Sequence, residues 1–501
     1  MHGDVKTRLT ELLAKALPAS SLVGSADYEI CGLAYHSAEV QPGDLFVAVR
    51  GFSRDGHDYA AEAVRRGAPA VVVDHVLADM AATQIVVPDT RRALAALAAA
   101  FYGDPSRRLW LCGVTGTNGK TTTSHLIHAI LSAAGHRNAV IGTIGVVAPE
   151  GPLAWHSSTS TTPEAPDLQR LLRDLRSRAV QDVVIEVTSH ALELSRVACC
   201  RFQAAVFTNL TQDHLDFHGD LIRYRDAKCR LFAMVDPPGV SVVNADDPAS
   251  RAMAAASRAR VITYGIDAAA DVRAVEIVLT ANGTRFKVVW PGGQQPLSLR
   301  LPGRFNVANA LAAFAVGHAR GVAPEEIAAA LESVNGVPGR CELVDEGQPF
   351  AVLVDYAHSP DSLEKILRLA AQVSRGRRIV VFGCGGDRDR TKRPIMGRIG
   401  TQLADYAVFT SDNPRGENPL AIIREIEAGA AGARNFESIP DRWRAIERGI
   451  ALAQAGDVVV IAGKGHETYQ IQGERIQAFD DREVAREVLR ARQDGVRAAR
   501  P

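Results

Sequence analysis

Short apolar runs alternate with segments of helical periodicity along most of the chain. In its middle part, apolar runs of strand length lie at 109–114, 139–142, 183–187, 204–208 and 240–244, whereas at 121–134 apolar residues recur every three or four positions. Such alternation predicts a mainly parallel β-sheet covered by helices, because parallel strands need crossover connections. The pattern therefore indicates an α/β fold.

The same alternation occurs on both sides of the middle part. The flanking apolar runs lie at 44–49, 69–73 and 84–87 before it, and at 351–355, 378–383, 407–410 and 458–462 after it. The turn-forming stretches GDPS at 103–106 and VPGR at 337–340 separate the three parts. We predict three α/β domains of ordinary size, at residues 1–104, 105–337 and 338–501.

Composition narrows the class of protein. The chain has 57 Lys and Arg against 57 Asp and Glu, which gives no general attraction to nucleic acid or anionic lipid. Its seven cysteines include no Cys-x-x-Cys pair, which argues against a disulfide framework or a zinc ribbon. The N-terminus has the pattern of an amphipathic helix and not of a signal peptide, and no stretch has the roughly 18 apolar residues of a membrane span. We expect a cytoplasmic monomer that binds small molecules, does not bind nucleic acid and has no membrane span.

The stretch VTGTNGKTTT, which ends at Thr123, places glycines, a lysine and hydroxyls between a predicted strand and a predicted helix. Gly116 and Gly119 let the backbone approach a ligand, and the unpaired N–H groups at the start of the helix favour an anion. Lys120 can reach terminal phosphates and Thr121 can hold Mg²⁺. The pattern predicts a nucleoside triphosphate site. A valine stands where the first glycine of G-x-x-x-x-G-K-[ST] is expected, so a Gly-rich turn without a ligand is the alternative.

Polar clusters follow two other strands of the middle part. They are Glu186, Thr188, Ser189 and His190 in one case, and Asn209, Asp213, His214 and Asp216 in the other. Because the carboxyl ends of parallel strands meet at one edge of a sheet, we expect these groups beside the phosphate site. Carboxylates and imidazoles suit a divalent metal there. The alternative is that they are helix caps and loop hydrogen bonds.

Polar loops also follow the four predicted strands of the third part. These loops are DYAH at 355–358, GCGGDRDR at 383–390, SDNPR at 411–415 and GKGHE at 463–467. Four such loops at one edge indicate a binding face, but GCGG does not match G-x-G-x-x-G, so we reject a dinucleotide site. In the first part, the polar loop 51–57 is either a surface turn or a ligand-binding edge.

Together these motifs resemble those of the Mur ligases. The set in chain order is TGTNGKTTT (115–123), TTP (161–163), EVTSH (186–190), DHLDFHGDLIRYRDAK (213–228), GRFNVAN (303–309), DYAHSP (355–360), SDNPR (411–415) and GKGHE (463–467). The resemblance covers nearly the whole chain. It is greatest to the Mur ligases that join meso-2,6-diaminopimelate to UDP-N-acetylmuramoyl-L-alanyl-D-glutamate (UDP-MurNAc-L-Ala-D-Glu).

The resemblance implies a reaction and a role for each domain. The N-terminal domain would bind UDP-MurNAc, the central P-loop domain ATP, and the C-terminal Rossmann-like domain the amino acid. The γ-phosphoryl group of ATP passes to the D-glutamyl γ-carboxylate, and the amine of meso-diaminopimelate attacks the acyl phosphate, in the synthesis of a peptidoglycan precursor. Charge stabilisation dominates such a reaction.

The resemblance also implies the residues of each site. For ATP they are Gly116, Thr117, Asn118, Gly119, Lys120, Thr121, Thr122, Asn306, Arg340 and Asp355, and for Mg²⁺ they are Thr121, Glu186, His214 and Lys228 as N6-carboxylysine. For UDP-MurNAc-L-Ala-D-Glu they are Ser37, Phe52, Ser53, Arg54, Thr161, Thr162, Thr188 and Arg196. For meso-diaminopimelate they are Arg388, Asp412, Asn413, Pro414, Arg415, Gly463 and Glu467.

Two of these residues have a plain alternative. Carbamylation of Lys228 by CO₂ would turn a cation that repels Mg²⁺ into an anion with two oxygens, and the reaction needs a neutral amine. The alternative is a surface lysine on the predicted helix 223–232. Arg415 would clasp the carboxylate that distinguishes diaminopimelate from lysine, or else be a solvated loop arginine.

The chain departs from its relatives at three places, and other functions stay open. It has His36-Ser37-Ala38 where relatives commonly have Asp-Ser-Arg, Ser160 where some carry Asn, and Leu194 in place of a polar residue. These departures affect the UDP-peptide contacts and not the reaction. The alternatives are another ligase of the superfamily, such as a folylpolyglutamate synthetase or a different Mur enzyme, and a non-catalytic nucleotide-binding regulator.

Overall fold

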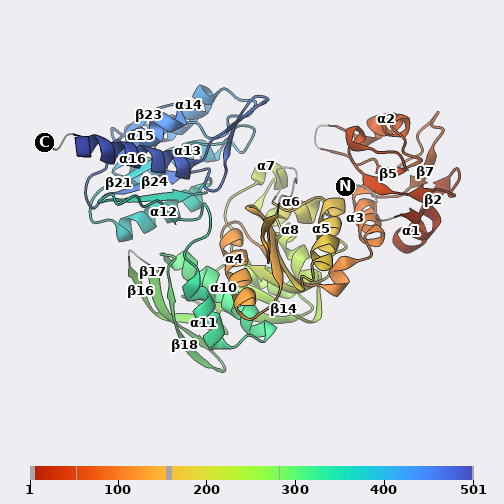
Figure 1. The fold of residues 1–501 in the computed structure, drawn as a ribbon, viewed down its shortest axis with the longest axis horizontal. Coiled ribbons are helices and arrows are strands. Elements are labelled where there is room, and N and C mark those ends of the chain that lie inside the picture. Colours follow the sequence, from red (N-terminus) through yellow and green to blue (C-terminus); the bar gives the residue numbers. More distant parts are fainter. Residues whose placement is uncertain (1–5, 52–53, 154–160, 281–282, 499–501) are drawn as a thin grey trace.

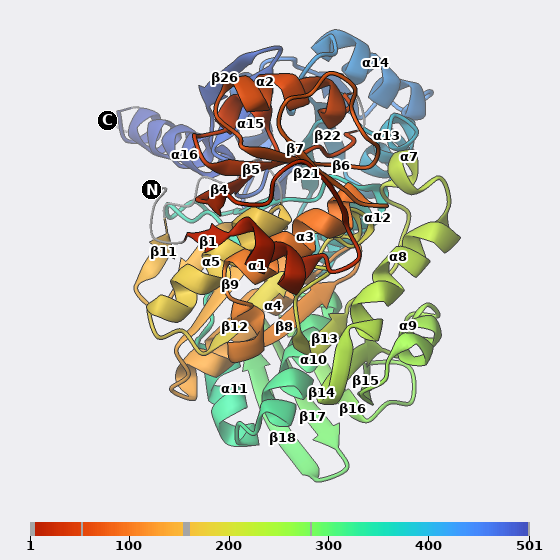
Figure 2. The same ribbon diagram turned by 90° about the vertical axis from the view of Figure 1, so that its right-hand side faces the viewer.

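Three main β-sheets follow one another along the chain. The structure is a computed structural model that describes residues 6–51, 54–153, 161–280 and 283–498. Its main sheets have five, eleven and six strands. In Figure 1 the N-terminal part lies at the right, the C-terminal part at the upper left, and the central part between and below them; Figure 2 gives the view from the N-terminal side. In the described part of the chain, no helix is both long enough and apolar enough to cross a membrane.

The N-terminal part is a five-stranded sheet with helices on both faces. Its elements are β1 (Thr7–Arg8), α1 (Leu9–Ala16), β2 (Ser21–Val23), β3 (Glu29–Ile30), β4 (Gly32–Ala34), η1 (Ser37–Glu39), β5 (Asp44–Val47), η2 (Gly56–Tyr59), α2 (Ala60–Arg65), β6 (Ala70–Val73), β7 (Thr83–Val86) and α3 (Thr90–Phe101). The strand order is β2-β7-β6-β5-β4, parallel except for β2. Successive side chains of β5 enter cores with α1 and α3 on one face and with α2 on the other.

The central part begins after the 3₁₀ helix η3 (Pro105–Arg108). Its elements are β8 (Trp110–Thr115), α4 (Lys120–Ala133), β9 (Asn138–Gly142), β10 (Gly145–Ala148), β11 (Gly151–Leu153), α5 (Ala165–Ser177), β12 (Asp182–Glu186), α6 (Ser189–Glu193), β13 (Phe202–Phe207), α7 (Leu215–His218), α8 (Leu221–Ala233), β14 (Val235–Asn244), α9 (Ser250–Ala256), β15 (Arg260–Gly265), β16 (Val272–Thr280), β17 (Gly283–Trp290), β18 (Gly293–Leu299), α10 (Arg304–Arg320) and α11 (Pro324–Ser333).

The middle of this sheet is parallel and buried on both faces. The strand order is β11-β10-β9-β12-β8-β13-β14-β15-β16-β17-β18, and the strands from β9 to β16 pair in parallel. Along β12, Val184 joins a core with α4, α10 and α11, while Val183 and Ile185 join the opposite core with α5 and α8. Burial on both faces explains why these strands are continuous apolar runs.

The C-terminal part repeats this design with six strands. Its elements are β19 (Glu342–Leu343), β20 (Ala351–Asp355), α12 (Pro360–Val373), β21 (Arg378–Phe382), α13 (Lys392–Leu403), β22 (Tyr406–Phe409), α14 (Pro419–Gly429), β23 (Phe436–Ser438), α15 (Arg442–Leu452), β24 (Val458–Ala462), β25 (Tyr469–Gln472), β26 (Arg475–Ala478) and α16 (Asp481–Ala498). The sheet order is β19-β20-β24-β21-β22-β23, and all pairs except β19–β20 are parallel. Helices α12, α13 and α14 cover one face, and α15 and α16 the other.

The predicted α/β fold with a mainly parallel central sheet is confirmed. The predicted strands and helices occur, most with ends within two residues of those expected, although β14 begins at 235 where the sequence pattern indicated 240. Two antiparallel additions were not predicted: β10–β11 at one edge of the central sheet and β16–β18 at the other. The hairpin β25–β26 was not predicted either.

Candidate active site

The phosphate-binding loop joins β8 to α4. Gly116 and Gly119 have φ of 148° and 86°, and a Cβ at Gly116 would collide with the Thr208 hydroxyl. Residues that follow β13 hold the loop: Thr208 Oγ1 donates to the Asn118 carbonyl at 2.6 Å, and Asn118 N–H donates to Asn209 Oδ1 at 3.0 Å. The loop backbone is therefore fixed where the α4 N-terminus can meet an anion.

Lys120 folds back over this loop. Its Nζ donates to the carbonyls of Gly116 and Thr117, both at 2.8 Å. Burial lowers the pKa of Lys120, and the carboxylates of Glu186 and Asp213 oppose that shift. The ammonium therefore lies against the phosphate loop, where a lysine can pair with a phosphate group. Thr122, in the first turn of α4, is buried.

Glu186 is a fully buried carboxylate at the end of β12. Its Oε2 accepts hydrogen bonds from the hydroxyls of Thr121 at 2.9 Å and Thr143 at 3.0 Å, and its Oε1 accepts from Thr143 N–H at 2.9 Å. Within the described residues no cationic side chain is hydrogen-bonded or ion-paired to it. A buried anion with only neutral donors favours an additional cation.

Two more candidate metal ligands lie on the segment after β13. His214 directly precedes α7 and has φ of 54°, its Nε2 lies 3.5 Å from Asp213 Oδ2, and burial lowers the pKa of its imidazole. Lys228, in α8, is 1% exposed, and its Nζ lies 4.1 Å from the centre of the Tyr224 ring. Burial lowers the pKa of Lys228 well below its usual value, with Lys120 adding to the shift. The alternative of a surface lysine is therefore wrong, because this side chain has no access to solvent.

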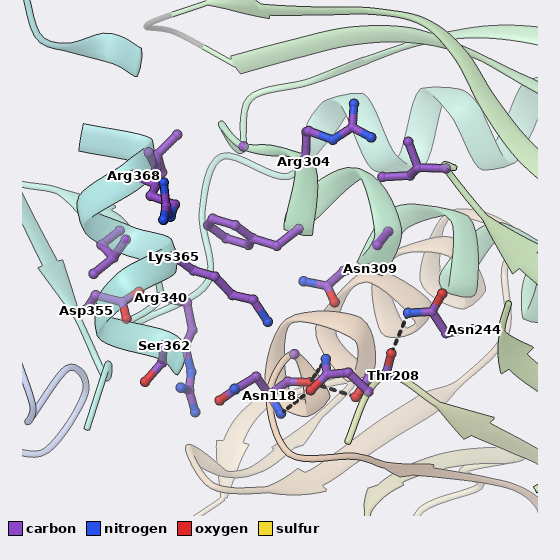
Figure 3. Close-up of a pocket in the computed structure, with 18 of the residues that line it drawn as sticks. Asn118, Thr208, Asn244, Arg304, Asn309, Arg340, Asp355, Ser362, Lys365 and Arg368 are labelled. Atoms are coloured by element: carbon purple, nitrogen blue, oxygen red, sulfur yellow. Dashed lines mark hydrogen bonds between the residues drawn. The ribbon is translucent and has the colours of Figure 1, made fainter. Parts of the chain in front are cut away.

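A cavity of about 370 Å³ lies between the central part and helix α12 (Figure 3). Asn118, Gly119, Asn309 and Arg304 line it from the central part, and Arg340, Asp355, Ser362 and Lys365 from the C-terminal part. Figure 3 shows Lys365 and Arg340 extending from the α12 side towards the phosphate loop. The cavity thus opens beside the loop that would hold the phosphates of a nucleotide.

Asp355 and Asn306, which were both predicted to bind ATP, are placed differently with respect to this cavity. Asp355 lines it, and its carboxylate accepts from the N–H groups of Cys341 at 2.6 Å and Ala357 at 2.8 Å. Burial raises the pKa of Asp355, and Arg340 opposes that shift. Asn306 is not part of the lining: its Oδ1 accepts from Asn309 Nδ2 at 3.2 Å, and Asn309 is the amide that faces the cavity.

Two contacts join the C-terminal part to the phosphate loop. Arg340 Nη2 donates to Thr121 Oγ1 at 2.9 Å, and the guanidinium lies 4.5 Å from the centre of the Tyr356 ring. Asp361, on α12, accepts from Asn118 Nδ2 at 2.6 Å. The site is therefore completed by residues that lie more than 200 positions apart in the sequence.

Four residues predicted for the UDP-peptide are connected by hydrogen bonds to Thr143 or to the backbone of Glu186. Thr162 Oγ1 donates to the Glu186 carbonyl at 2.8 Å and lies 3.3 Å from Thr188 Oγ1, while Thr161 Oγ1 lies 3.2 Å from Thr143 Oγ1. Arg196 donates to the Thr162 carbonyl at 2.9 Å. The structure thus joins these threonines to the candidate metal site.

The N-terminal residues predicted for the same ligand are not joined to that group by a described contact. Ser37 donates to Glu62 at 3.0 Å within its own part, and Arg54 is exposed. Phe52 and Ser53 lie outside the described residues, as does Ser160. Leu194 follows α6 directly.

The residues predicted for the amino acid converge at the carboxyl ends of β21, β22 and β24. Asn413 Nδ2 donates to Glu467 Oε2 at 2.8 Å, and a Cβ at Gly463 would come within 2.6 Å of Asp412 Oδ2. Pro414 is buried in the same loop.

Two guanidinium groups accompany them. Arg415 is half-buried and donates to the Gly386 carbonyl at 3.0 Å, so it is not a solvated arginine. Burial lowers the pKa of Arg388, and the charge of Arg415 lowers it further. Two guanidiniums and a carboxylate in one place suit a ligand that carries both carboxylate and ammonium groups.

Several residues of this site were missed by sequence reasoning. Thr143 follows the predicted strand 139–142, so the rule that ligand groups follow parallel strands could have found it. Asn309 lies in the GRFNVAN motif, about one helical turn after Asn306, the asparagine that was predicted to bind ATP. No pattern in the sequence marked Asp361 as a contact of the phosphate loop.

Comparison with known proteins gives matches over nearly the whole chain. Family models match at residues 29–102 (Mur ligase family, catalytic domain), 114–317 (Mur ligase middle domain) and 339–465 (Mur ligase, glutamate ligase domain). The chain is 48% identical over 492 residues to a protein of Geobacillus thermodenitrificans named UDP-N-acetylmuramoyl-L-alanyl-D-glutamate--2,6-diaminopimelate ligase, covering 97% of this chain and 100% of that one. A protein of the same name from Solibacter usitatus is 46% identical, covering 96% and 98%.

Solved structures show the same likeness. A structure of a protein with that name has 31% identity and a TM-score of 0.68, covering 97% of this chain and 99% of that one. A structure of MurF from Acinetobacter baumannii, at 22% identity and a TM-score of 0.65 over 91% and 95% of the two chains, shares the fold. With these matches to all three parts and nearly half of its residues identical to a full-length relative, the chain belongs to the Mur ligase family.

Proposed function

We propose that this chain is an ATP-dependent ligase that joins meso-2,6-diaminopimelate to the D-glutamyl γ-carboxylate of UDP-MurNAc-L-Ala-D-Glu. The observation that carries the proposal is the 45–48% identity, over nearly full length, to relatives that bear the name of this activity. The site supports it, because a phosphate loop, a buried carboxylate and a loop with two guanidiniums lie in one molecule. We place the reaction in the cytoplasm, carried out by a monomer, as one step of peptidoglycan precursor synthesis.

The proposed reaction has two steps. The γ-phosphoryl group passes to the γ-carboxylate of the UDP-peptide, and ADP leaves. The neutral amine of diaminopimelate then attacks the acyl phosphate, inorganic phosphate departs, and the amine loses a proton as the amide forms. Lys120 and Arg340 stand where they can stabilise the negative charge on the transferred group.

Mg²⁺ would supply charge neutralisation between phosphate and carboxylate. Its proposed ligands are Thr121, Glu186, His214 and carbamylated Lys228. The buried Glu186 carboxylate fits this role because its partners are neutral hydroxyl and N–H groups. Oxygen ligands of this kind match the preference of a hard cation.

We assign the remaining ligands by domain. Residues 1–104 would bind the UDP-sugar through Ser37 and the loop 52–54, and residues 105–337 would bind ATP and the peptide through Thr161, Thr162, Thr188 and Arg196. Residues 338–501 would receive diaminopimelate, with Arg388 and Arg415 for its carboxylates and Glu467 for an ammonium group. Opposite charges and bidentate geometry support this assignment.

An ADP-release assay on the full chain tests the proposal. With ATP, Mg²⁺ and UDP-MurNAc-L-Ala-D-Glu, we expect ADP release to depend on meso-diaminopimelate and not on L-lysine or L-glutamate. The Lys120→Ala variant should lose this release. Equal release with lysine or glutamate would indicate a different ligase of the superfamily, and release that ignores the UDP-peptide would indicate a nucleotide-binding protein of another kind.

A further inference from the structure

Lys464 is a buried lysine to which the proposed reaction assigns no role. It follows β24 in the GKGHE loop, and its side chain is 0% exposed. Its Nζ donates to Asn413 Oδ1 and to Glu467 Oε2, both at 3.1 Å. Burying an ammonium is costly unless it is paired and hydrogen-bonded, and here its partners are two residues proposed to bind the amino acid.

The amide of Asn413 is oriented by this contact. Its Oδ1 accepts from Lys464 and from the Ile471 N–H at 3.0 Å, and its Nδ2 donates to Glu467 Oε2 at 2.8 Å. Two donors on one side and an acceptor on the other leave a single favourable orientation of the amide. The hairpin β25–β26, which carries Ile471, is therefore part of the support.

Glu467 is held by one oxygen only. Both of its side-chain hydrogen bonds fall on Oε2, its side chain is 13% exposed, and Oε1 accepts no hydrogen bond from the residues that the structure describes. A carboxylate fixed in this way keeps one oxygen available for an ammonium group of a ligand.

The charge of Lys464 also bears on Glu467. Burial raises the pKa of Glu467, the negative charge of Asp412 raises it further, and Lys464 opposes both. The other ionisable groups that act on or respond to this carboxylate are Tyr356, Arg442 and Tyr469. Without the ammonium, two neighbouring carboxylates would favour a protonated Glu467, which cannot form an ion pair.

We propose that Lys464 is a positioning residue for the amino-acid acceptor: it fixes Asn413 and Glu467 so that one Glu467 oxygen meets an ammonium group of the incoming diamino acid. This inference rests on the proposed function. Lys464 itself does not touch the ligand, because its side chain is completely covered. Its effect should therefore appear in acceptor binding and not in nucleotide binding.

The test is Lys464→Met in the full chain, which keeps the length of the side chain and removes its charge. We expect the KM for meso-diaminopimelate to rise by about tenfold, while the KM for ATP changes by less than about twofold. The acid limb of kcat/KM for the amino acid should move to higher pH, since loss of a nearby cation raises the pKa of a carboxylate. The control is Lys287→Met, which also removes a lysine that is paired with a glutamate, Glu276. Lys287 lies in β17 of the central part and not in the proposed amino-acid site.

A double variant separates positioning from folding. Glu467→Gln combined with Lys464→Met removes both charges of the pair, while Arg442 and Arg415 still act on the neighbouring Asp412 carboxylate. We expect Lys464→Met to raise the KM for diaminopimelate less in the Glu467→Gln background than in the unmodified chain, because part of its effect is exerted through Glu467. An equal rise in both backgrounds would overturn the inference, and so would a Lys464→Met enzyme with lower thermal stability but unchanged KM and pH profile.

The unmodified chain distinguishes the two proposals. Acceptor-dependent ADP release in the unmodified chain, with kinetics unchanged in Lys464→Met, would overturn this inference alone. No acceptor-dependent release in the unmodified chain would overturn the proposed function and the inference together.

Discussion

At the scale of single residues, burial and the neighbouring groups together decide the chemistry of the ionisable side chains of this site. Lys228 and Lys464 are both lysines on polar, motif-rich segments, yet both are fully enclosed. Lys464 is hydrogen-bonded to a carboxylate, whereas Lys228 lies against an aromatic ring and near a second lysine. Two lysines with similar exposure therefore have different partners: Lys464 is paired with a carboxylate, whereas burial and a neighbouring lysine lower the pKa of Lys228 and favour its neutral amine.

The first prediction concerns Lys228. Lys228→Ala should be nearly inactive and partly rescued by a short carboxylic acid, because the acid can replace the oxygens of a carbamate. Lys228→Arg, which keeps a positive charge, should not recover. Steady-state ADP release measures both, and Arg223→Ala, an exposed change on the same helix, serves as control. Full activity of Lys228→Arg in CO₂-depleted buffer would contradict the prediction.

The second prediction concerns Arg415. Arg415→Ala should lose about 2 to 4 kcal/mol in kcat/KM for meso-diaminopimelate, because it removes the proposed charge-assisted pair with the carboxylate that distinguishes diaminopimelate from lysine. The KM for ATP should stay within twofold. Arg448→Ala, at a surface ion pair with Glu437 in the same domain, is the matched control. Unchanged kinetics in Arg415→Ala would place the recognition of that carboxylate elsewhere.

At the scale of elements, the ends of parallel strands position the chemistry. The loop after β8 is fixed by residues after β13, and the carboxylate at the end of β12 is held by the residue after β9. These strands are neighbours in the sheet, in the order β9-β12-β8-β13, so the loops that follow them lie side by side although they are far apart in the sequence. The close approach of the loops explains the glycine at position 116.

The third prediction tests this close approach. Gly116→Ala should abolish nucleotide binding, because a Cβ there would collide with the Thr208 hydroxyl and the φ of 148° is strained for any side chain, at a cost of about 1 to 3 kcal/mol. Calorimetric titration with ATP measures it, with circular dichroism as a check on the fold. Gly336→Ala is the control, since a Cβ there meets nothing within 4 Å. Retained ATP affinity in Gly116→Ala would mean that the loop can adopt another path.

At the scale of the whole molecule, the side chains of Asp361 and Arg340 connect the C-terminal part to the central part at the nucleotide cavity. Asp361 accepts from Asn118 in the phosphate loop and, at 3.3 Å, from Thr211 in the loop after β13, so one carboxylate contacts two loops of the central part. Arg340 donates to Thr121. Helix α12 lines one side of the cavity, and these hydrogen bonds hold it there. We therefore expect nucleotide affinity and closure of the C-terminal part on the central part to be coupled.

The fourth prediction follows from that coupling. Asp361→Ala should raise the KM for ATP by on the order of tenfold and increase the radius of gyration in solution scattering, because loss of charge-assisted hydrogen bonds favours an open arrangement. Glu364→Ala removes a carboxylate of the same helix that pairs with Arg368, and should change neither quantity by as much. A compact Asp361→Ala chain with unchanged ATP kinetics would show that closure does not depend on this contact.

Much of the molecule follows from local sequence alone. Apolar runs of strand length have to be buried, and segments of helical periodicity form the helices that cover them. The α/β fold, most elements and the phosphate loop were therefore predictable from the order of residues. The antiparallel strands β10, β11 and β16–β18 were not predicted, because strands that mix buried and exposed residues, as β10, β17 and β18 do, lack a continuous apolar run.

The tertiary structure decided which polar groups share an environment. Glu186 with Thr143, Asn118 with Asp361, and Lys464 with Glu467 and Asn413 depend on strand order and domain contact, which residue spacing does not encode. The same holds for burial: the sequence left Lys228 as either a buried amine or a surface cation, and packing of α8 against the sheet resolved this. Local sequence determined which elements form because their energetics act within a few residues, whereas pairing and desolvation of charges act across the assembled fold and appear only there.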